Sequence, residues 1–214
     1  MTRPYAVRIN DLVFHGGEIV GVAAIEGNGQ RRLLRSIAGV EPRAAGITVT
    51  GTVAFVPEDR TTEALIADFS LSANLLLGRL RSASRWIDWN ELGTETTAII
   101  ERHDVRATGP GAAASSLSGG NQQKFILARA LEAGPDILVV EEPTRGLDLH
   151  ATAVVREALR AAAAGGACVL VHSSDLDEVL ELADRLLVMV DGRVTELPGD
   201  TARDTVGDAM LGLV

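Results

Sequence analysis

Three short apolar runs, separated by helical patterns, constrain the fold of this chain more than any other feature. They are EIVGVAAI at 18–25, DILVVE at 136–141 and ACVLVH at 167–172. Such runs, rich in β-branched residues, are typical of strands buried on both faces of a sheet. Because strands alternate with helices along the chain, the sequence predicts an α/β fold with a mainly parallel sheet flanked by helices.

The remaining patterns complete this alternation and leave one helical insertion. Helices are expected at 31–38, 120–133, 150–164 and 175–183, a strand at 52–57, and a hairpin at 185–196 that turns at Asp191-Gly192. The insertion follows residue 64, and its helical spacing is carried by Leu65, Ile66, Leu75, Leu76, Leu77, Leu92, Ile99 and Ile100. A turn-rich stretch at 107–116 ends it. We therefore expect a single domain with a core of about 1–63 and 115–214 and a helical subdomain of about 64–114.

Composition excludes several classes of protein. The 214 residues suit one domain, and the net charge of −9 disfavours sequence-independent nucleic-acid binding, which needs clustered Lys and Arg. The only cysteine, Cys168, allows no disulfide within the chain and is expected as a buried strand residue in a cytosolic protein. No secretory signal and no apolar stretch of membrane-spanning length is visible, so we expect any membrane contact to come through another protein.

The segment LSGGNQQK at 117–124 carries the strongest chemical signal. Ser118 is expected to cap the helix that begins there, and Gly119 and Gly120 would let a phosphate approach the backbone. The amide end of a helix also attracts anions. Taken alone, the segment could be an ordinary serine-capped helix after a glycine turn.

Carboxylates in two other places make a phosphate site the better interpretation. The strand that ends in Glu141-Glu142 delivers two acidic groups 23 residues after Ser118 (141 − 118), which suits positioning of a metal and water beside a phosphate. Pro57-Glu58-Asp59-Arg60 follows another strand, and a glycine turn at 26–29 joins the first strand to a helix.

In this order, the motifs resemble the ATP-binding-cassette (ABC) ATPase family over nearly the whole chain. LSGGNQQK resembles its signature motif, DILVVEEPTRGLD its Walker B strand and D-loop, VPEDR its Q-loop, and VHSSDLDE its switch-histidine segment. More narrowly, EGNGQ, VPEDR, SLSGGNQQK and PTRGLD resemble the second ATPase half of tandem proteins from simple-sugar and nucleoside importers. In that subfamily two such domains share one polypeptide, so the chain is expected to be an excised half or a separately encoded one.

The resemblance implies a P-loop-type sheet with a small N-terminal antiparallel β portion, and ATP and Mg²⁺ as cofactors. It assigns nucleotide contacts to Glu26, Gly27, Asn28, Gly29, Gln30, Arg31, Arg32, Ser118, Gly119, Gly120, Gln122 and Asp148. It assigns catalytic positions to Glu142 and Ser174 and metal positions to Glu58 and Glu141. Tyr5 is a candidate for stacking on adenine.

The phosphate loop departs from the pattern G-x-x-x-x-G-K-[ST]. Aligned on the turn, the chain has Ala24 for the first glycine, Gln30 for the lysine and Arg31 for the hydroxyl residue. Lys124, the only lysine, belongs to the signature helix. Losing a hydrogen bond to a charged phosphate would weaken binding by about one to two powers of ten. Arg31 has no acceptor for Mg²⁺ but could neutralise a phosphate together with Arg32, or the two could simply be solvated.

Further departures concern the acidic site. Glu26 adds negative charge near the loop and opposes nucleotide binding. Glu141 replaces the family's aspartate and is one methylene longer. Ser174 occupies the switch-histidine position, while His172, two residues earlier, is expected to be a buried strand-end histidine. Glu142 retains the catalytic glutamate of the family.

Because family members work as head-to-tail dimers, the resemblance implies that Ser118–Gln122 closes over ATP held by a partner's intact P-loop, while the chain's own site works weakly. The expected partners are a second ABC ATPase domain, transmembrane permease subunits that dock on the helical segment at 64–110 beside Glu58 and Asp59, and indirectly a solute-binding protein. This places the chain at the cytoplasmic face of the plasma membrane.

Two alternatives remain open. In one, the chain is a non-catalytic nucleotide-binding and dimerisation module that docks to the permease, and replacing Glu142 by Gln leaves transport unchanged. In the other, it is an ABC protein of translation or DNA repair, which the negative charge and the lack of a long coiled-coil insertion disfavour.

Overall fold

The computed structural model of the protein describes residues 6–78 and 86–213. The chain forms two compact units. The first runs to Phe55 and takes in Pro135–Pro143 and the chain from Arg156 onward, and the second comprises Val56–Gly134 and Thr144–Val155. Tyr5, the candidate for adenine stacking, lies outside the described residues.

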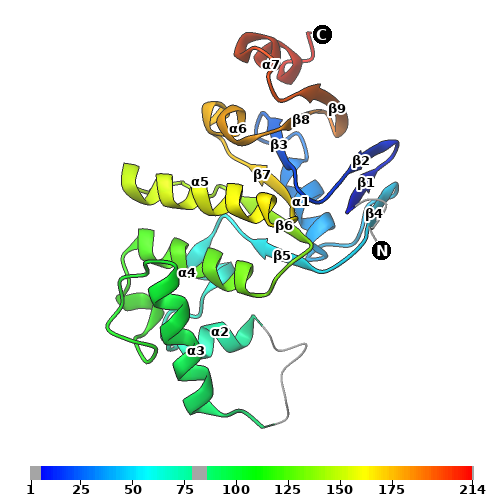
Figure 1. The fold of residues 1–214 in the computed structure, drawn as a ribbon. Coiled ribbons are helices and arrows are strands. Elements are labelled where there is room, and N and C mark those ends of the chain that lie inside the picture. The colour runs from blue at the N-terminus through cyan, green and yellow to red at the C-terminus, as the bar shows by residue number, and fades with distance from the viewer. Residues whose placement is uncertain (1–5, 79–85, 214) are drawn as a thin grey trace. The chain divides into compact units, whose positions relative to one another are not determined.

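A six-stranded sheet forms the centre of the first unit (Figure 1). Its spatial order is β5 (Val53–Val56), β6 (Ile137–Glu141), β7 (Cys168–His172), β3 (Ile19–Ala24), β8 (Arg185–Val190) and β9 (Arg193–Pro198). The pairs β6–β7, β7–β3 and β3–β8 are parallel, and the β8–β9 hairpin is antiparallel. This confirms the mainly parallel sheet that the apolar runs predict.

Helices pack on both faces of the sheet. They are α1 (Gln30–Ala38), α6 (Leu176–Leu182) and α7 (Arg203–Met210). Alternate residues of β3 face opposite cores: Val20 and Val22 share one cluster with α1, whereas Ala23 packs with Val179 of α6. A Cβ at Gly21 would lie 2.5 Å from Cγ1 of Val179, so a glycine is required for α6 to approach the strand this closely.

A second, three-stranded sheet has the order β2 (Leu12–Phe14), β1 (Val7–Ile9), β4 (Ile47–Val49), and both its strand pairs are antiparallel. It confirms the small N-terminal β portion. The buried side chains of Val7, Ile9 and Phe14 join the core cluster on the α1 face of the large sheet. The small sheet thus helps to anchor the helix that follows the glycine turn.

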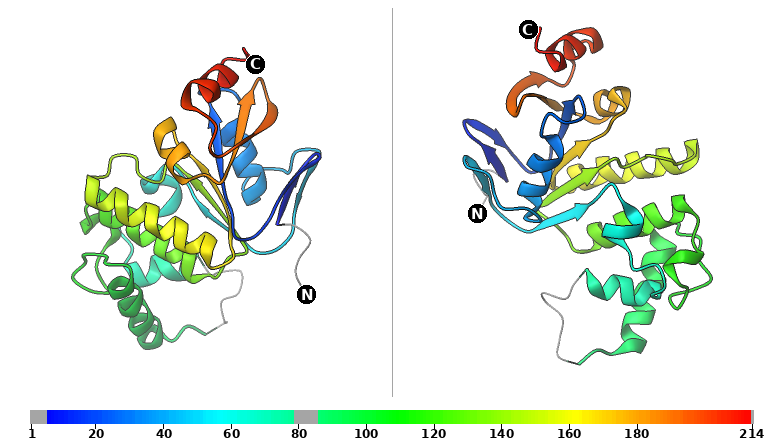
Figure 2. Two further views of the ribbon diagram at one scale, coloured as in Figure 1. Left: turned by 45° about the horizontal axis from the view of Figure 1, so that its top comes forward. Right: turned by 180° about the vertical axis from the view of Figure 1, so that it is seen from behind.

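The second unit is helical (Figure 2). It contains the π-helical turn η1 (Arg60–Ala64), α2 (Leu71–Leu77), α3 (Trp89–Arg102), the 3-10 turn η2 (Ala114–Ser116) and α4 (Gly119–Glu132), and α5 (Leu149–Ala164) begins in it. Leu75, Ile99 and Phe125 are almost fully buried, one on each of α2, α3 and α4. In the described residues, no helix combines the length and the apolar character needed to cross a membrane.

The helical spacing expected at Leu65 and Ile66 does not correspond to a helix, whereas Leu75 lies on α2. Asp59 caps a π-helical turn that ends at Ala64, and Leu65 is extended, with φ −125° and ψ 147°. The next helix starts only after Ser70, whose hydroxyl caps it. Local capping by two polar side chains therefore interrupts a spacing that looks continuous in the sequence.

Candidate functional site

The candidate site of the first unit lies where three neighbouring parallel strands end. Strands β6, β7 and β3 are adjacent, and their carboxyl ends lead into Glu142, into Ser173-Ser174 and into the glycine turn at 25–29. In open α/β sheets, ligands bind outside the carboxyl ends of the strands. The topology thus brings together three groups of residues that the sequence places far apart.

The glycine turn after β3 is held in shape by its own backbone and by a neighbouring hairpin. Gly27 and Gly29 have φ of +93° and +98°, which side chains rarely tolerate. The backbone N–H and the side-chain Nδ2 of Asn28 donate to the carbonyl of Ile25 at 3.2 and 3.1 Å. Oδ1 of Asn28 accepts from the backbone N–H of Asp191, in the β8–β9 turn, at 2.8 Å. The turn is therefore built before any ligand arrives.

Helix α1 starts with an open amide end. Gly29 is its N-cap, no side chain caps it, and its first turn holds no acidic residue. Such an end suits an anion. The side chain of Gln30 does not contribute to anion binding at this end. It is buried, and its Nε2 donates to Oε2 of Glu26 at 3.3 Å. Its Oε1 has no donor within the described residues. Arg31 and Arg32 follow on the exposed side of the helix.

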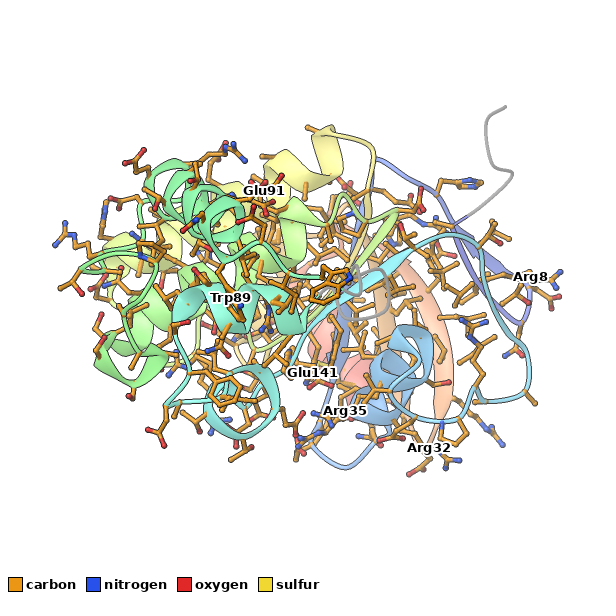
Figure 3. All side chains as sticks on the ribbon, turned by 90° about the horizontal axis from the view of Figure 1, so that it is seen from below. Arg8, Arg32, Arg35, Trp89, Glu91 and Glu141 are labelled. Carbon is orange, nitrogen blue, oxygen red and sulfur yellow. The ribbon has the colours of Figure 1, made fainter. Side chains whose placement is uncertain are left out.

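Glu141, at the end of β6, is bound by an arginine that the sequence analysis did not single out. Nε and Nη2 of Arg35 donate to the two carboxylate oxygens at 3.1 and 3.0 Å (Figure 3). Both residues are buried, with Glu141 only 2% exposed. Arg35 lies one turn beyond Arg31 on α1, so this bidentate pair ties α1 to the end of β6. The structure thus places the expected metal ligand in an ion pair.

Glu142, the next residue, has a left-handed backbone with φ +47° and lies close to the end of β7. Its carboxylate oxygens accept from the backbone N–H of Ser174 at 2.6 Å and from its hydroxyl at 3.0 Å. His172 lies on β7, as expected, with Nδ1 2.8 Å from the carbonyl of Val22 and Nε2 4.0 Å from Oε1 of Glu142. The two residues expected at catalytic positions, Glu142 and Ser174, are therefore in direct contact.

The signature segment lies in the second unit, where it opens α4. Ser118 is the N-cap residue, but its side chain makes no capping bond, so the expected cap is wrong. Its hydroxyl accepts instead from Nδ2 of Asn121 at 2.9 Å, because this amide competes for the oxygen. Nε2 of Gln122 donates to the carbonyl of Ala114 at 3.0 Å and fixes the preceding turn. Ser118 is exposed, and its side chain makes no capping hydrogen bond to the amide end of α4.

Arg60, another residue that the motif analysis did not assign, braces the signature turn. Its Nη1 lies 3.4 Å from the carbonyl oxygens of both Gly119 and Arg145. The side chain of Arg145 in turn pairs with Glu58. Glu58, expected near a metal, thus takes part in an ion pair within the second unit.

Two further polar residues of the second unit have structural partners. Oδ1 of Asp148 accepts from the backbone N–H of Ala151 at 2.8 Å and begins α5. Nζ of Lys124, the only lysine of the chain, binds both the backbone oxygen and Oδ2 of Asp104 at 2.9 and 2.7 Å. Lys124 lies on α4, the helix to which the sequence analysis assigned it.

The expected site residues fall into two groups. The first unit brings together the glycine turn, α1, Glu141, Glu142 and Ser174, and the second unit brings together Glu58, Asp148 and the signature segment. Sequence reasoning missed Arg35, and it named Arg60 and Asp191 only as parts of a motif and of a hairpin turn, with no role in the site. Only Arg35 had a usable signal, because it lies one helical turn after Arg31 and Glu141 is a longer carboxylate than the family norm.

These features define a class of nucleotide-binding domain: a parallel sheet with a glycine turn leading into a helix, a carboxylate pair on the neighbouring strand end, and a helical unit that carries an LSGG segment. The chain belongs to the ABC transporter family, whose model matches residues 9–145.

Solved structures agree with this fold. An inward-facing metal-chelate type ABC transporter matches with a TM-score of 0.81 and 20% identity, over 98% of this chain and 90% of that one. A dimeric ATP-binding cassette in a post-hydrolysis state bound to ADP and phosphate matches with a TM-score of 0.74 and 20% identity, over 87% and 88% of the two chains.

Curated relatives are more similar in sequence. The nucleoside import ATP-binding protein NupA of Lactococcus lactis subsp. cremoris is 37% identical over 92% of this chain and 43% of its own length. The glucose import ATP-binding protein TsgD13 of Haloferax volcanii is 38% identical over 94% and 41%. The ribose import ATP-binding protein RbsA 2 of Streptomyces coelicolor is 37% identical over 95% and 44%. The chain therefore spans about two fifths of the length of these relatives.

Proposed function

We propose that this chain is an ATP-binding domain of an ABC importer for simple sugars or nucleosides and that it acts mainly on ATP held by a second ATPase domain. The names of the relatives that import nucleosides, glucose and ribose support this class of solute. Their greater length supports a second ATPase domain, on the same polypeptide or on another chain.

One contrast carries the proposal. The signature segment Ser118–Gln122 is complete, and the side chain of Ser118 makes no capping hydrogen bond to the amide end of its helix. The chain's own phosphate loop instead has Gln30 and Arg31 where a lysine and a hydroxyl residue would hold phosphate and Mg²⁺. In this arrangement the partner's P-loop holds Mg-ATP, and the signature segment donates hydrogen bonds to its γ-phosphate in the transition state.

The same proposal places the chain at the cytoplasmic face of the membrane, through transmembrane permease subunits that a solute-binding protein supplies with solute. We assign the docking surface to the helical segment at 64–110. In support, Trp86 and Trp89 in this segment are 86% and 55% exposed, and large exposed aromatic residues are enriched at protein interfaces.

The test is ATP hydrolysis and solute uptake by the complete transporter in liposomes. Ser118→Arg places a bulky cation at the start of α4, and we expect loss of both activities, because the partner's ATP loses its signature contacts. Ser115→Arg is the matched control, since Ser115 is exposed three residues earlier, and it should keep both activities. Equal activity of the two variants would contradict action on the partner's ATP.

A second candidate function, a non-catalytic dimerisation and docking module, is favoured by the contact between Glu142 and Ser174. Both oxygens of this carboxylate already accept hydrogen bonds from Ser174. In a non-catalytic module Glu142→Gln leaves transport unchanged, whereas in an enzyme half that hydrolyses its own ATP the substitution lowers it. Measuring transport by this variant separates a module without hydrolysis at its own site from an enzyme half that hydrolyses its own ATP.

A further inference from the structure

The ABC family implies Mg²⁺ beside a bound nucleotide, so we tested whether the residues at the end of β6 fit this ion. Mg²⁺ requires open oxygen ligands in octahedral geometry. The two oxygens of Glu141 are bound by Arg35 at 3.1 and 3.0 Å, and those of Glu142 by Ser174 at 2.6 and 3.0 Å. The loop residue Arg31 supplies no oxygen. Oε1 of Gln30 is the one buried side-chain oxygen of the loop without a donor among the described residues, and a single neutral oxygen does not make an octahedral site. These residues do not fit Mg²⁺.

The charge of Glu141 at this strand end is nevertheless balanced. Glu141 is 2% exposed, and a buried carboxylate is costly unless a cation pairs with it and satisfies its lone pairs. Arg35 does both through a planar, bidentate contact, and its guanidinium also lies over the ring of Phe55 at 5.6 Å from the centroid. The permanent positive charge of Arg35 thus offsets the negative charge of Glu141, which a divalent ion would otherwise do.

We propose that the chain's own phosphate loop binds a nucleotide polyphosphate without a divalent cation, because Arg35 neutralises Glu141. This inference rests on the proposed function, in which the loop at 26–32 keeps weak nucleotide binding. Arg35 is a positioning residue here, since it acts through Glu141. The open amide end of α1 and the exposed residue Arg32 supply the positive potential for the phosphates.

The experiment measures binding of the fluorescent analogue mant-ATP to the complete chain, once in EDTA and once in excess Mg²⁺. We expect the wild-type chain to bind equally well in both. In Arg35→Met the buried Glu141 lacks its cation and repels the polyphosphate, so affinity in EDTA should fall by about tenfold or more and Mg²⁺ should restore it. The melting temperature of this variant should also rise with added Mg²⁺, whereas that of the wild-type chain should not change.

Two further variants control for folding and for a general effect of arginine loss. The double variant Arg35→Met with Glu141→Gln removes both charges, so it should fold better than the single variant. Its affinity for mant-ATP should again be the same in EDTA and in excess Mg²⁺. Arg160→Met removes an exposed arginine that pairs with Glu181 at 3.2 Å, and it should behave like the wild-type chain.

The inference is overturned by wild-type binding that requires Mg²⁺, by absence of mant-ATP binding in both buffers, or by an Arg35→Met chain no more dependent on Mg²⁺ than the wild type. If Arg35→Met fails to fold even in Mg²⁺, the double variant decides: a Mg²⁺ requirement there also contradicts the proposal, and its absence supports it. None of these results affects the role of the signature segment, which the Ser118→Arg experiment tests separately.

Discussion

Ser174 donates two hydrogen bonds to the carboxylate of Glu142, from its backbone N–H at 2.6 Å and from its hydroxyl at 3.0 Å. The contact links the first residue after β6 to the loop after β7. A general base needs a lone pair directed at its water. In Glu142, two acceptor positions of the carboxylate are already occupied by the hydrogen bonds from Ser174. The pair therefore stabilises the loop as well as modulating any chemistry of Glu142.

Ser174→Ala should weaken this loop measurably. The substitution removes the hydroxyl donor and keeps the backbone one, so we expect a loss of about 1 kcal/mol, or roughly 2–4 °C in melting temperature for a chain of this size. Thermal unfolding followed by circular dichroism measures it. Ser115→Ala, at an exposed position, should leave the melting temperature unchanged, and an equal drop in both variants would argue against a stabilising role for the Ser174 hydroxyl.

Asn28→Ala should loosen the glycine turn. The side chain donates to the carbonyl of Ile25 at 3.1 Å and accepts from the backbone N–H of Asp191 at 2.8 Å, and alanine can make neither bond. We expect a loss of about 1–2 kcal/mol in unfolding free energy. Faster hydrogen exchange of the amides at 27–29 and 191–192 would show that the turn itself has opened.

For Asn28 the informative control is the swap to aspartate. Asn28→Asp keeps the acceptor for the Asp191 amide but loses the donor to Ile25. We therefore expect an intermediate effect on exchange. Exchange at 27–29 that stays at the wild-type rate in Asn28→Ala would mean that the glycine backbone alone holds the turn.

Local signals in the sequence were enough for the fold. The runs at 18–25, 136–141 and 167–172 became β3, β6 and β7, because apolar strands buried on both faces need no long-range information to be recognised. The hairpin around Asp191-Gly192 followed from turn chemistry in the same way. Helical spacing gave a wrong prediction at Leu65 and Ile66, because Asp59 and Ser70 cap separate helical segments on either side of them.

The site was less predictable, since its decisive contacts join residues distant in the chain. Arg35 and Glu141 are 106 positions apart, and Asn28 and Asp191 are 163 apart. No periodicity or spacing encodes such a pair, and only the packing of α1 and the strand ends against one another produces it. The loss of the lysine at Gln30, in contrast, is visible in the sequence itself.

Cys168 should resist thiol reagents as long as the chain is folded. Burial, followed by the charge of Glu18, raises the pKa of its thiol to about 12, so almost no reactive thiolate exists at pH 8. In the unfolded chain the pKa is about 8.5 and labelling is fast. Reaction with Ellman's reagent should therefore be slow in buffer and rapid in urea. A Ser115→Cys variant provides an exposed thiol as the control, and rapid labelling of Cys168 in buffer would contradict its burial.

The pair between Lys124 and Asp104 predicts how the stability of the second unit depends on pH. Hydrogen bonding and charge attraction from Lys124 lower the pKa of Asp104. Its folded pKa is thus below the unfolded value of about 3.9, so the contribution is fully present above the unfolded pKa and is lost as pH falls through the folded pKa. The midpoint of urea unfolding should decrease in this acidic window more for the wild-type chain than for Asp104→Asn.

Asp104→Asn tests this without disturbing the backbone. Asp104 has φ +49°, a conformation that asparagine tolerates, and its backbone oxygen still accepts from Nζ of Lys124 at 2.9 Å. The variant should be less stable than the wild type at pH 7, and the two midpoints should converge as pH falls below about 3.9. Asp68→Asn, at another exposed acidic residue of the same unit, should follow the wild-type curve. If the gap between wild type and Asp104→Asn stays constant across this range, the carboxylate charge is not what holds Lys124.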